Sequence, residues 1–330
     1  MFSQRTARQL YRIPILLICL ILCACQKQQD TQVLKMAHGL DTEHPVHKAM
    51  VFMAERLDQL SAGTMKIDIY PNAQLGGERE LMELLQIGSI ALTKVSTSPM
   101  ESFVPQFKVF SIPYAFRDYD HLWQVLQGEP GRELLMAGES VRLRGLGFYD
   151  AGSRSFYTRD AAIGNPEDLK GKKIRVQNSI TSVEMVRALG GAATPIPWGE
   201  LYTALQQGVV DGAENNPPSY YLSKQYEAAP YFSLDEHTFV PDILLVSLPV
   251  WRSLSPQQQQ WLQQAADESV ILQRKLWKKT TVEVLQKLEQ AGVTISYPDK
   301  QPFRDAVAPM HASYKGTPVG NFLARIAAVK

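Results

Sequence analysis

Apolar residues along the first hundred positions alternate between two spacings. The spacing typical of strands occurs at residues 33–37, 65–69 and 90–95. Helical spacing fills the intervals, over residues 45–60 and 78–87. The resulting order of strand, helix, strand, helix and strand predicts an α/β fold, with helices on both faces of a largely parallel sheet.

The same order of elements returns after residue 140. Strands are expected at residues 143–149, 173–176 and 209–213. Helices are expected between the last two of these strands, over residues 182–189 and 200–207. The chain therefore contains two α/β halves.

Two short segments of these halves match each other. Residues 84–90 (LLQIGSI) align with residues 204–210 (ALQQGVV), and the glycine of each stands where a helix is expected to end. This match predicts two similar lobes. Because ligands bind beyond the carboxyl ends of such strands and between domains, residues 96–97 and 215–216 are expected beside a shared cleft.

A very long helix is expected near the C-terminus. Ser255 and Pro256 form a typical helix start, and Gly292 follows the last residues with helical spacing. A helix over this range is about 50 Å long at 1.5 Å per residue. Since no strict heptad persists, we interpret it as a strut across both lobes rather than as a coiled coil.

The first 24 residues have the composition of a secretory leader. Three arginines precede an apolar stretch at residues 13–22, which is too short to span a bilayer stably. The sequence LCAC at 22–25 resembles a bacterial lipobox. We therefore expect a lipoprotein signal peptide over residues 1–24, a lipid on Cys25 and a lipidated tether over residues 25–32. An ordinary secretory signal, cleaved beside Cys25, is the alternative.

All three cysteines, Cys19, Cys23 and Cys25, lie in or beside this leader. The body of the chain that follows has no thiol for a disulfide, a Cys-ligated metal or a catalytic thiolate. The His-Pro-Val-His run at residues 44–47 fits a helix start better than a pair of metal ligands. We therefore expect no metal.

Composition also argues against several classes of function. The formal net charge is +1 and there is no basic tract, so nucleic acid is not an expected partner. The glycines at residues 145 and 147 lack the third glycine of a dinucleotide fingerprint, and no phosphate loop or Gly-x-Ser-x-Gly elbow occurs. Neither an enzyme nor a cofactor is predicted.

The run GKKIRVQNS at residues 171–179 is the strongest candidate for binding chemistry. In an extended strand Ile174 and Val176 share one face, and Arg175 points to the other. The planar guanidinium of arginine pairs with a carboxylate through two parallel hydrogen bonds. Taken alone, the run also fits an edge strand with solvated charges.

Five motifs resemble those of the solute-binding proteins of tripartite ATP-independent periplasmic (TRAP) transporters. They are DLKGKKIRV at residues 168–176, ELYTALQQGVVDGAEN at 200–215, PNAQLGG at 71–77, IPYAF at 112–116 and LSP at 254–256. The resemblance implies a two-lobed, periplasmic-binding-protein-like α/β fold, with a long helix spanning both lobes. On this basis lobe I comprises residues 31–151 plus 241–280, and lobe II comprises residues 152–240 plus 281–330.

The resemblance also implies a binding site. Arg175 matches the principal ligand contact of the family, and Arg154 matches a second arginine that follows a turn upstream. Asn215 follows the D-G-x-E motif. Glu78 matches a polar position after the Q-L-G turn, and His38 matches an early polar position by its place alone. Two aromatic residues, Trp198 and Tyr220, are expected to form walls of the cleft.

The implied function is that of an extracytoplasmic receptor, which binds an organic acid and delivers it to the membrane subunits of a TRAP permease. We favour a sugar acid, such as a hexuronate or an aldonate, because Glu78, Asn216 and residues 153–157 offer partners for hydroxyl groups. A C4-dicarboxylate, and a role as the ligand-presenting partner of a membrane sensor kinase, are the alternatives. The expected location is the periplasm, with a lipid anchor in the membrane at Cys25.

Overall fold

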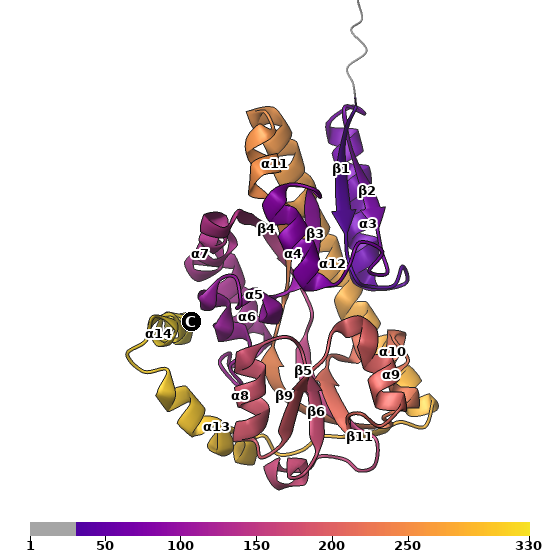
Figure 1. Ribbon diagram of the computed structural model, residues 1–330, viewed down its shortest axis with the longest axis vertical. Coiled ribbons are helices and arrows are strands. Elements are labelled where there is room, and N and C mark those ends of the chain that lie inside the picture. The colour runs from indigo at the N-terminus through magenta and orange to yellow at the C-terminus, as the bar shows by residue number, and fades with distance from the viewer. Residues whose placement is uncertain (1–30) are drawn as a thin grey trace, which may run out of the picture. The chain divides into compact units, whose positions relative to one another are not determined.

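The structure, a computed structural model, describes residues 31–330. The predicted signal peptide, Cys25 and most of the predicted tether lie outside the described residues. Two sheets organise the described part, with the orders β2-β1-β3-β10-β4 and β11-β9-β5-β8-β6-β7 (Figure 1). The strands of the first are β1 (Gln32–Ala37), β2 (Met65–Tyr70), β3 (Leu92–Ser96), β4 (Leu143–Tyr149) and β10 (Asp242–Ser247). Those of the second are β5 (Ser153–Thr158), β6 (Lys173–Val176), β7 (Ala192–Pro195), β8 (Gly212–Asn215), β9 (Tyr231–Phe239) and β11 (Thr294–Ser296).

Both sheets are mixed rather than largely parallel, which corrects our expectation. In the first sheet β1 and β3 run parallel, whereas β10 runs antiparallel to β3 and β4. In the second sheet β5 runs antiparallel to β8 and β9, and only β6 runs parallel to both of its neighbours, β7 and β8. The chain crosses between the sheets from β4 to β5 and returns from β9 to β10. Strands β5 and β10 each begin directly after the chain crosses from one sheet to the other. They therefore start at the edge of the sheets where β3, β6 and β8 end, and they run in the opposite direction to these strands.

Two helices of the first lobe form where the spacing of apolar residues predicts them. Helix α3 (Pro45–Leu60) begins after His44, whose Nδ1 accepts a hydrogen bond from Val46 N at 3.3 Å. Helix α4 (Glu78–Ile87) ends at Gly88, which has a left-handed φ of 76°. The other helical segments here are α5 (Thr97–Met100), η1 (Pro105–Phe110), α6 (Tyr119–Gln127), α7 (Glu129–Ala137), η2 (Glu139–Val141) and α11 (Leu248–Ser253).

The second lobe repeats part of this arrangement. Helix α9 (Leu201–Gln206) is followed by Gly208, whose φ of 71° matches that of Gly88. The two glycines therefore end equivalent helices, as the match between the halves predicts. Strand β8 begins later than expected, because residues 209–211 form the connection that precedes it. The remaining helical segments are η3 (Pro166–Leu169), α8 (Ile180–Ala188), η4 (Trp198–Glu200), α10 (Pro217–Leu222) and η5 (Gln225–Glu227).

The predicted long helix is α12 (Pro256–Gln290), which has 35 residues. The Ser255 side chain caps its first turn, and Gln258 bonds back to the Ser255 backbone. In Figure 1 the helix runs from the first lobe behind the molecule to the second, and it contacts α3 and β4 above and α10 below. Within residues 31–330, no helix has the length and apolarity needed to cross a membrane.

The C-terminal helices contact both lobes. Helix α13 (Gln301–Ser313) packs against α8, and Nε2 of its residue His311 lies 2.6 Å from the carbonyl oxygen of Pro113. Helix α14 (Pro318–Ala328) packs against η1 and α7 of the first lobe, although the predicted lobe II includes its residues. The residue boundaries of the lobes stay a prediction.

Candidate ligand-binding site

A cavity of about 150 Å³ lies between the two sheets. An engineered cavity of this volume holds a benzene molecule, so there is room for one six-membered ring. Both lobes and α12 line it. Its polar and aromatic lining includes His44, Glu78, Lys94, Ser96 and Asp242 from the first lobe, Arg154, Arg175, Gln177, Trp198, Asn215, Asn216 and Ser219 from the second, and Trp277 from α12.

The ends of the strands bring these side chains together. Strand β3 ends at Ser96 and β8 ends at Asn215, whereas β10 begins at Asp242. Asp242 pairs with Ser96 across the first sheet, and Ser155 pairs with Asn215 across the second. The cavity is therefore at the carboxyl ends of strands from both sheets, where ligands bind in open α/β folds.

Arg175 is a buried cation with an unpaired nitrogen. The pleat of β6 buries Ile174 and Val176 completely on one face, and Arg175, which is 2% exposed, lines the cavity on the other. Its Nε donates to the carbonyl oxygen of Ile196 at 2.8 Å, while Nη1 has no hydrogen-bond partner among residues 31–330. Burial lowers the pKa of Arg175, but an arginine stays charged at neutral pH.

Arg154 is equally buried but fully engaged. Its Nε bonds to the Glu214 carboxylate, and Nη2 donates to Glu214 Oε1 at 2.9 Å and to the Glu214 carbonyl oxygen at 2.7 Å. Its Nη1 donates to Asn215 Oδ1 at 2.8 Å. Arg154 therefore neutralises Glu214 and orients Asn215, whose Nδ2 remains as a donor.

A buried network supports this pair from behind. Nε2 of His237 lies 3.6 Å from Glu214 Oε2, and its Nδ1 lies 2.8 Å from Asp235 Oδ2. Burial would raise the pKa of Glu214, but Arg154 and His237 hold it at about 2. Burial would lower the pKa of His237, but Asp235 and Glu214 raise it to about 9. The four side chains thus form two pairs of opposite charge.

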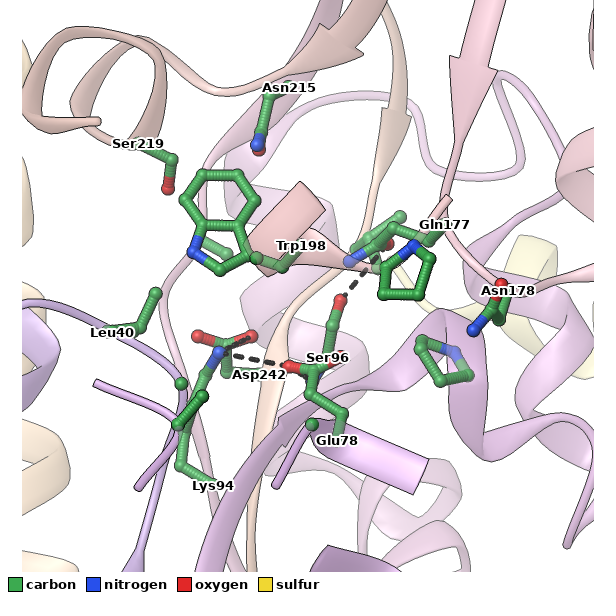
Figure 2. Close-up of a pocket in the computed structure, with 18 of the residues that line it drawn as sticks. Leu40, Glu78, Lys94, Ser96, Gln177, Asn178, Trp198, Asn215, Ser219 and Asp242 are labelled. Carbon is green, nitrogen blue, oxygen red and sulfur yellow. Dashed lines mark hydrogen bonds and ion pairs between the residues drawn. The ribbon is translucent and has the colours of Figure 1, made fainter. Parts of the chain in front are cut away.

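Lys94 forms a second charged group on the side of the first lobe. Its Nζ lies 3.0 Å from Asp242 Oδ1 and 3.4 Å from Glu78 Oε1 (Figure 2). Glu78 Oε1 also accepts a hydrogen bond from Ser96 N at 2.9 Å. Burial and the Glu78 charge raise the pKa of Asp242 to about 6, against the opposing effect of Lys94. Burial would lower the pKa of Lys94, but the two carboxylates raise it.

Two hydrogen bonds cross the cavity between the lobes. Ser96 Oγ lies 3.3 Å from Gln177 Oε1, and His44 Nε2 lies 3.4 Å from Ser219 Oγ. In Figure 2 Asn215 and Ser219 are drawn on the side of the cavity opposite Lys94. The Trp198 indole is drawn between these two residues and Lys94. The structure therefore describes lobes that meet around the cavity.

Residues 36–317 match the family of bacterial extracellular solute-binding proteins, family 7, also called DctP. This match spans most of the chain. The chain belongs to this family. Its members bind solutes outside the cytoplasm rather than catalyse reactions, and the predicted resemblance to TRAP solute-binding proteins is confirmed.

Solved structures extend this family assignment to the two-lobed fold. A TRAP periplasmic solute-binding protein from Xanthobacter autotrophicus Py2, with bound β-D-galacturonate, is 38% identical; the match covers 90% of this chain and 100% of that one, with a TM-score of 0.87. A second from Pseudomonas putida F1, with bound D-glucuronate, is 36% identical over 90% and 97% of the two chains, with a TM-score of 0.87. The C4-dicarboxylate-binding periplasmic protein DctP of Rhodobacter capsulatus is 29% identical over 284 residues, or 84% of this chain and 85% of that one.

The cavity of this solute-binding protein contains most of the predicted site residues. Arg175, Arg154, Asn215, Glu78 and Trp198 all line it. The family motifs do not indicate that Arg154 is already paired. Its partner, Glu214, belongs to one of these motifs, but the two side chains meet only through the pairing of β5 with β8.

Two predicted site residues do not line the cavity. His38 is buried beside it, where Nδ1 accepts a hydrogen bond from Leu40 N at 3.1 Å and Nε2 lies 3.0 Å from His47 Nδ1. Tyr220 is buried in the core of the second lobe, and its hydroxyl donates to the carbonyl oxygen of Ala229 at 2.7 Å. Instead, Leu40 lines the cavity near His38, and Ser219 does so beside Tyr220. A contact of His38 or Tyr220 with the ligand stays a prediction.

Sequence reasoning missed two residues of the cavity that a pattern could have indicated. Lys94 lies in β3, whose five residues are all buried, and Asp242 is the first residue of the fully buried strand β10. A charged residue is rarely buried without a partner. Two unexplained opposite charges in buried strands are therefore a signal for an ion pair, although their pairing depends on the antiparallel register of β3 and β10.

Proposed function

We propose that this solute-binding protein binds a sugar acid in the cavity, with the ligand carboxylate on Arg175, and delivers it to a TRAP permease. The observation that carries the proposal is the buried Arg175 guanidinium, whose Nη1 has no partner among the described residues. A buried cation without a partner is unfavourable. An anion that accepts a hydrogen bond from Nη1 therefore binds favourably, because it supplies the opposite charge that the guanidinium lacks.

The remaining groups of the cavity suit the hydroxylated ring of such an acid. Asn215 Nδ2 is a donor beside Arg154, and Ser219 Oγ can both donate and accept. Trp198 offers an aromatic face to the apolar side of a sugar ring. The two relatives with bound galacturonate and glucuronate, at 38% and 36% identity, support the same class of ligand.

Capture requires the lobes to move relative to each other. The proposed ligand would touch Arg175 and Asn215 from the second lobe and Lys94 or Glu78 from the first. Contacts that the ligand makes only when the lobes meet stabilise the closed arrangement relative to the open one, by the free energy of those contacts. The closed form would then be the one that the permease receives.

We further propose that the protein works in the periplasm and is held at the membrane by a lipid on Cys25. The support is the LCAC sequence at residues 22–25, which lies outside the described residues. Cys25→Ser should move the protein from the membrane fraction to the soluble fraction. An unchanged distribution would contradict the anchor and leave the binding proposal intact.

Calorimetric titration of the purified protein with D-galacturonate, D-glucuronate and succinate tests the proposed ligand class. We expect both uronates to bind and succinate to bind at least tenfold more weakly. Tight binding of succinate alone would favour the second candidate, a C4-dicarboxylate receptor, which the Rhodobacter capsulatus relative supports.

An arginine variant tests the position of the carboxylate. Arg175→Lys keeps the charge but loses the paired geometry, so uronate binding should fall by about 100-fold, which corresponds to roughly 2.7 kcal/mol. Arg187→Lys, on the exposed side of α8, is the matched control and should leave affinity unchanged. Undiminished binding by Arg175→Lys would show that the carboxylate lies elsewhere.

A further inference from the structure

The charges around the cavity are unequal on its two sides. On the side of the second lobe, Arg175 is a cation without a carboxylate partner among residues 31–330. On the side of the first lobe, one ammonium group, that of Lys94, is shared by Asp242 at 3.0 Å and Glu78 at 3.4 Å (Figure 2). With both carboxylates ionised, this second group carries one excess negative charge.

Among the described residues that line the cavity, Arg175 is the one cation without a carboxylate partner, and the other basic side chains are paired or neutral. Arg154 is bound to Glu214 through two of its nitrogens. Burial, and then the nearby charge of Lys94, lower the pKa of His44 well below its usual value, so its ring is neutral. Arg79 lies at the exposed edge and pairs with Glu83 at 3.1 Å. Among the described residues that line the cavity, this leaves Arg175 to receive a carboxylate.

We propose that Glu78 and Asp242, held on Lys94, exclude a second carboxylate from the cavity and select acids with one carboxylate and hydroxyl groups at the opposite end. The inference rests on the proposed function, since it places the first carboxylate on Arg175. A hydroxyl group donates a hydrogen bond to a carboxylate, whereas an ionised ligand carboxylate has no proton to donate and carries the same charge.

The geometry of the first-lobe group supports a role toward ligand. Side chains of Lys94 and Asp242 are 6% and 8% exposed, but that of Glu78 is 22% exposed, so the cavity reaches it. Glu78 Oε1 takes both hydrogen bonds, from Ser96 N and Lys94 Nζ, and Oε2 remains for another donor. Both carboxylates are fixed in place, so a second anion could not push them aside without breaking the Lys94 contacts.

A matched pair of ligands isolates this charge effect. Galactonate and galactarate are open chains of the same length that differ in one terminal group, a CH2OH in the first and a carboxylate in the second. Calorimetric titration of the purified protein at pH 7.5 should show that galactarate binds about 100-fold more weakly than galactonate, because like charges face each other at one end.

Three variants test which residues cause the rejection. Asp242→Asn and Glu78→Gln each remove one negative charge with little change of shape, and each should reduce the galactonate preference at least tenfold. Glu55→Gln makes the same change of net charge on the exposed face of α3, away from the cavity lining, and should keep the full preference. The readout is the ratio of the two dissociation constants, which a general loss of stability would not change selectively.

The outcomes separate this inference from the proposed function. If the wild-type protein binds the two ligands within threefold of each other, the exclusion is refuted and the sugar-acid proposal stands. The exclusion is also refuted if galactarate is rejected but both charge variants keep the full preference for galactonate. If Asp242→Asn does not fold, Glu78→Gln alone decides whether the carboxylates cause the rejection, because Glu78 lies at a partly exposed helix start. If galactonate, galacturonate and galactarate all fail to bind, both proposals fall.

Discussion

The same substitution should destabilise the protein much more at one of the two buried arginines of the cavity than at the other. Arg154 and Arg175 are 4% and 2% exposed, and both line the cavity. Methionine is an unbranched apolar residue of comparable length, so it removes the charge while filling much of the space. We compare Arg154→Met with Arg175→Met in the protein without ligand.

Arg154→Met should be strongly destabilising. It removes the bonds from Nε and Nη2 to Glu214 and from Nη1 to Asn215, and it leaves a buried carboxylate with His237 as its remaining partner. Breaking a buried ion pair from one side costs about 3–5 kcal/mol. Because His237 compensates part of the charge, we expect about 3 kcal/mol.

Arg175→Met should cost much less. The guanidinium has no carboxylate partner among the described residues, and the substitution breaks one described hydrogen bond, from Nε to the Ile196 carbonyl oxygen. A hydrogen bond from a charged donor contributes about 1.5–3 kcal/mol, and removing an unpaired buried charge offsets part of that loss. We therefore expect a net change below about 2 kcal/mol.

Urea unfolding at pH 7 measures both effects. The midpoints should shift while the dependence on urea concentration stays constant, so that the free energies are comparable. Arg187→Met, an exposed arginine of α8, should change stability by no more than about 0.5 kcal/mol. A larger loss for Arg175→Met than for Arg154→Met would refute the assignment of Arg154 as the paired arginine and Arg175 as the one that awaits a ligand.

Two further predictions concern stability and closure. The pKa of His237 is about 9 in the folded chain, above the usual 6.5. The charged imidazolium therefore stabilises the fold fully below pH 6.5, and this contribution is lost as the pH rises toward 9. Urea unfolding should show that the free energy of unfolding falls by about 3 kcal/mol between pH 6.5 and pH 9. His237→Gln should flatten that slope, and an unchanged slope would contradict the assignment. Glu101 of the first lobe accepts a hydrogen bond from Thr181 N at 3.0 Å, at the start of α8. Glu101→Ala should therefore weaken uronate binding about fivefold by calorimetry, with a loss of about 1 kcal/mol; equal affinity would show that this contact does not favour closure.

Local patterns predict the strands β1 to β4, β6 and β8 and the helices α3, α4, α8, α9 and α12. The helix start at Pro45, the left-handed glycines after α4 and α9, and the capped start of α12 depend on residues that are neighbours in the sequence. The directions of β5 and β10 do not, because they depend on where the chain crosses between the lobes. That is why two α/β halves could be predicted while the mixed sheets could not.

The same distinction applies to the candidate site. Its arginines and Asn215 could be named from motifs, and Arg175 could be given a direction from the alternation of its strand. What a strand pattern cannot supply is the partner that each charge meets. Lys94 and Asp242 are 148 positions apart in the chain and meet only through the register of β3 with β10.

Pairing, more than burial, decides what each charged residue in this cavity can do. Arg154, Lys94 and Arg175 are all buried cations. Glu214 engages Arg154, and Asp242 with Glu78 engages Lys94, so these two cations fix the positions of other groups. Arg175 has its aliphatic neighbours buried, one described hydrogen bond, and an unpartnered Nη1. In the proposed binding mode, a ligand anion would therefore gain most at Arg175, and the carboxylates held on Lys94 would restrict the rest of that ligand.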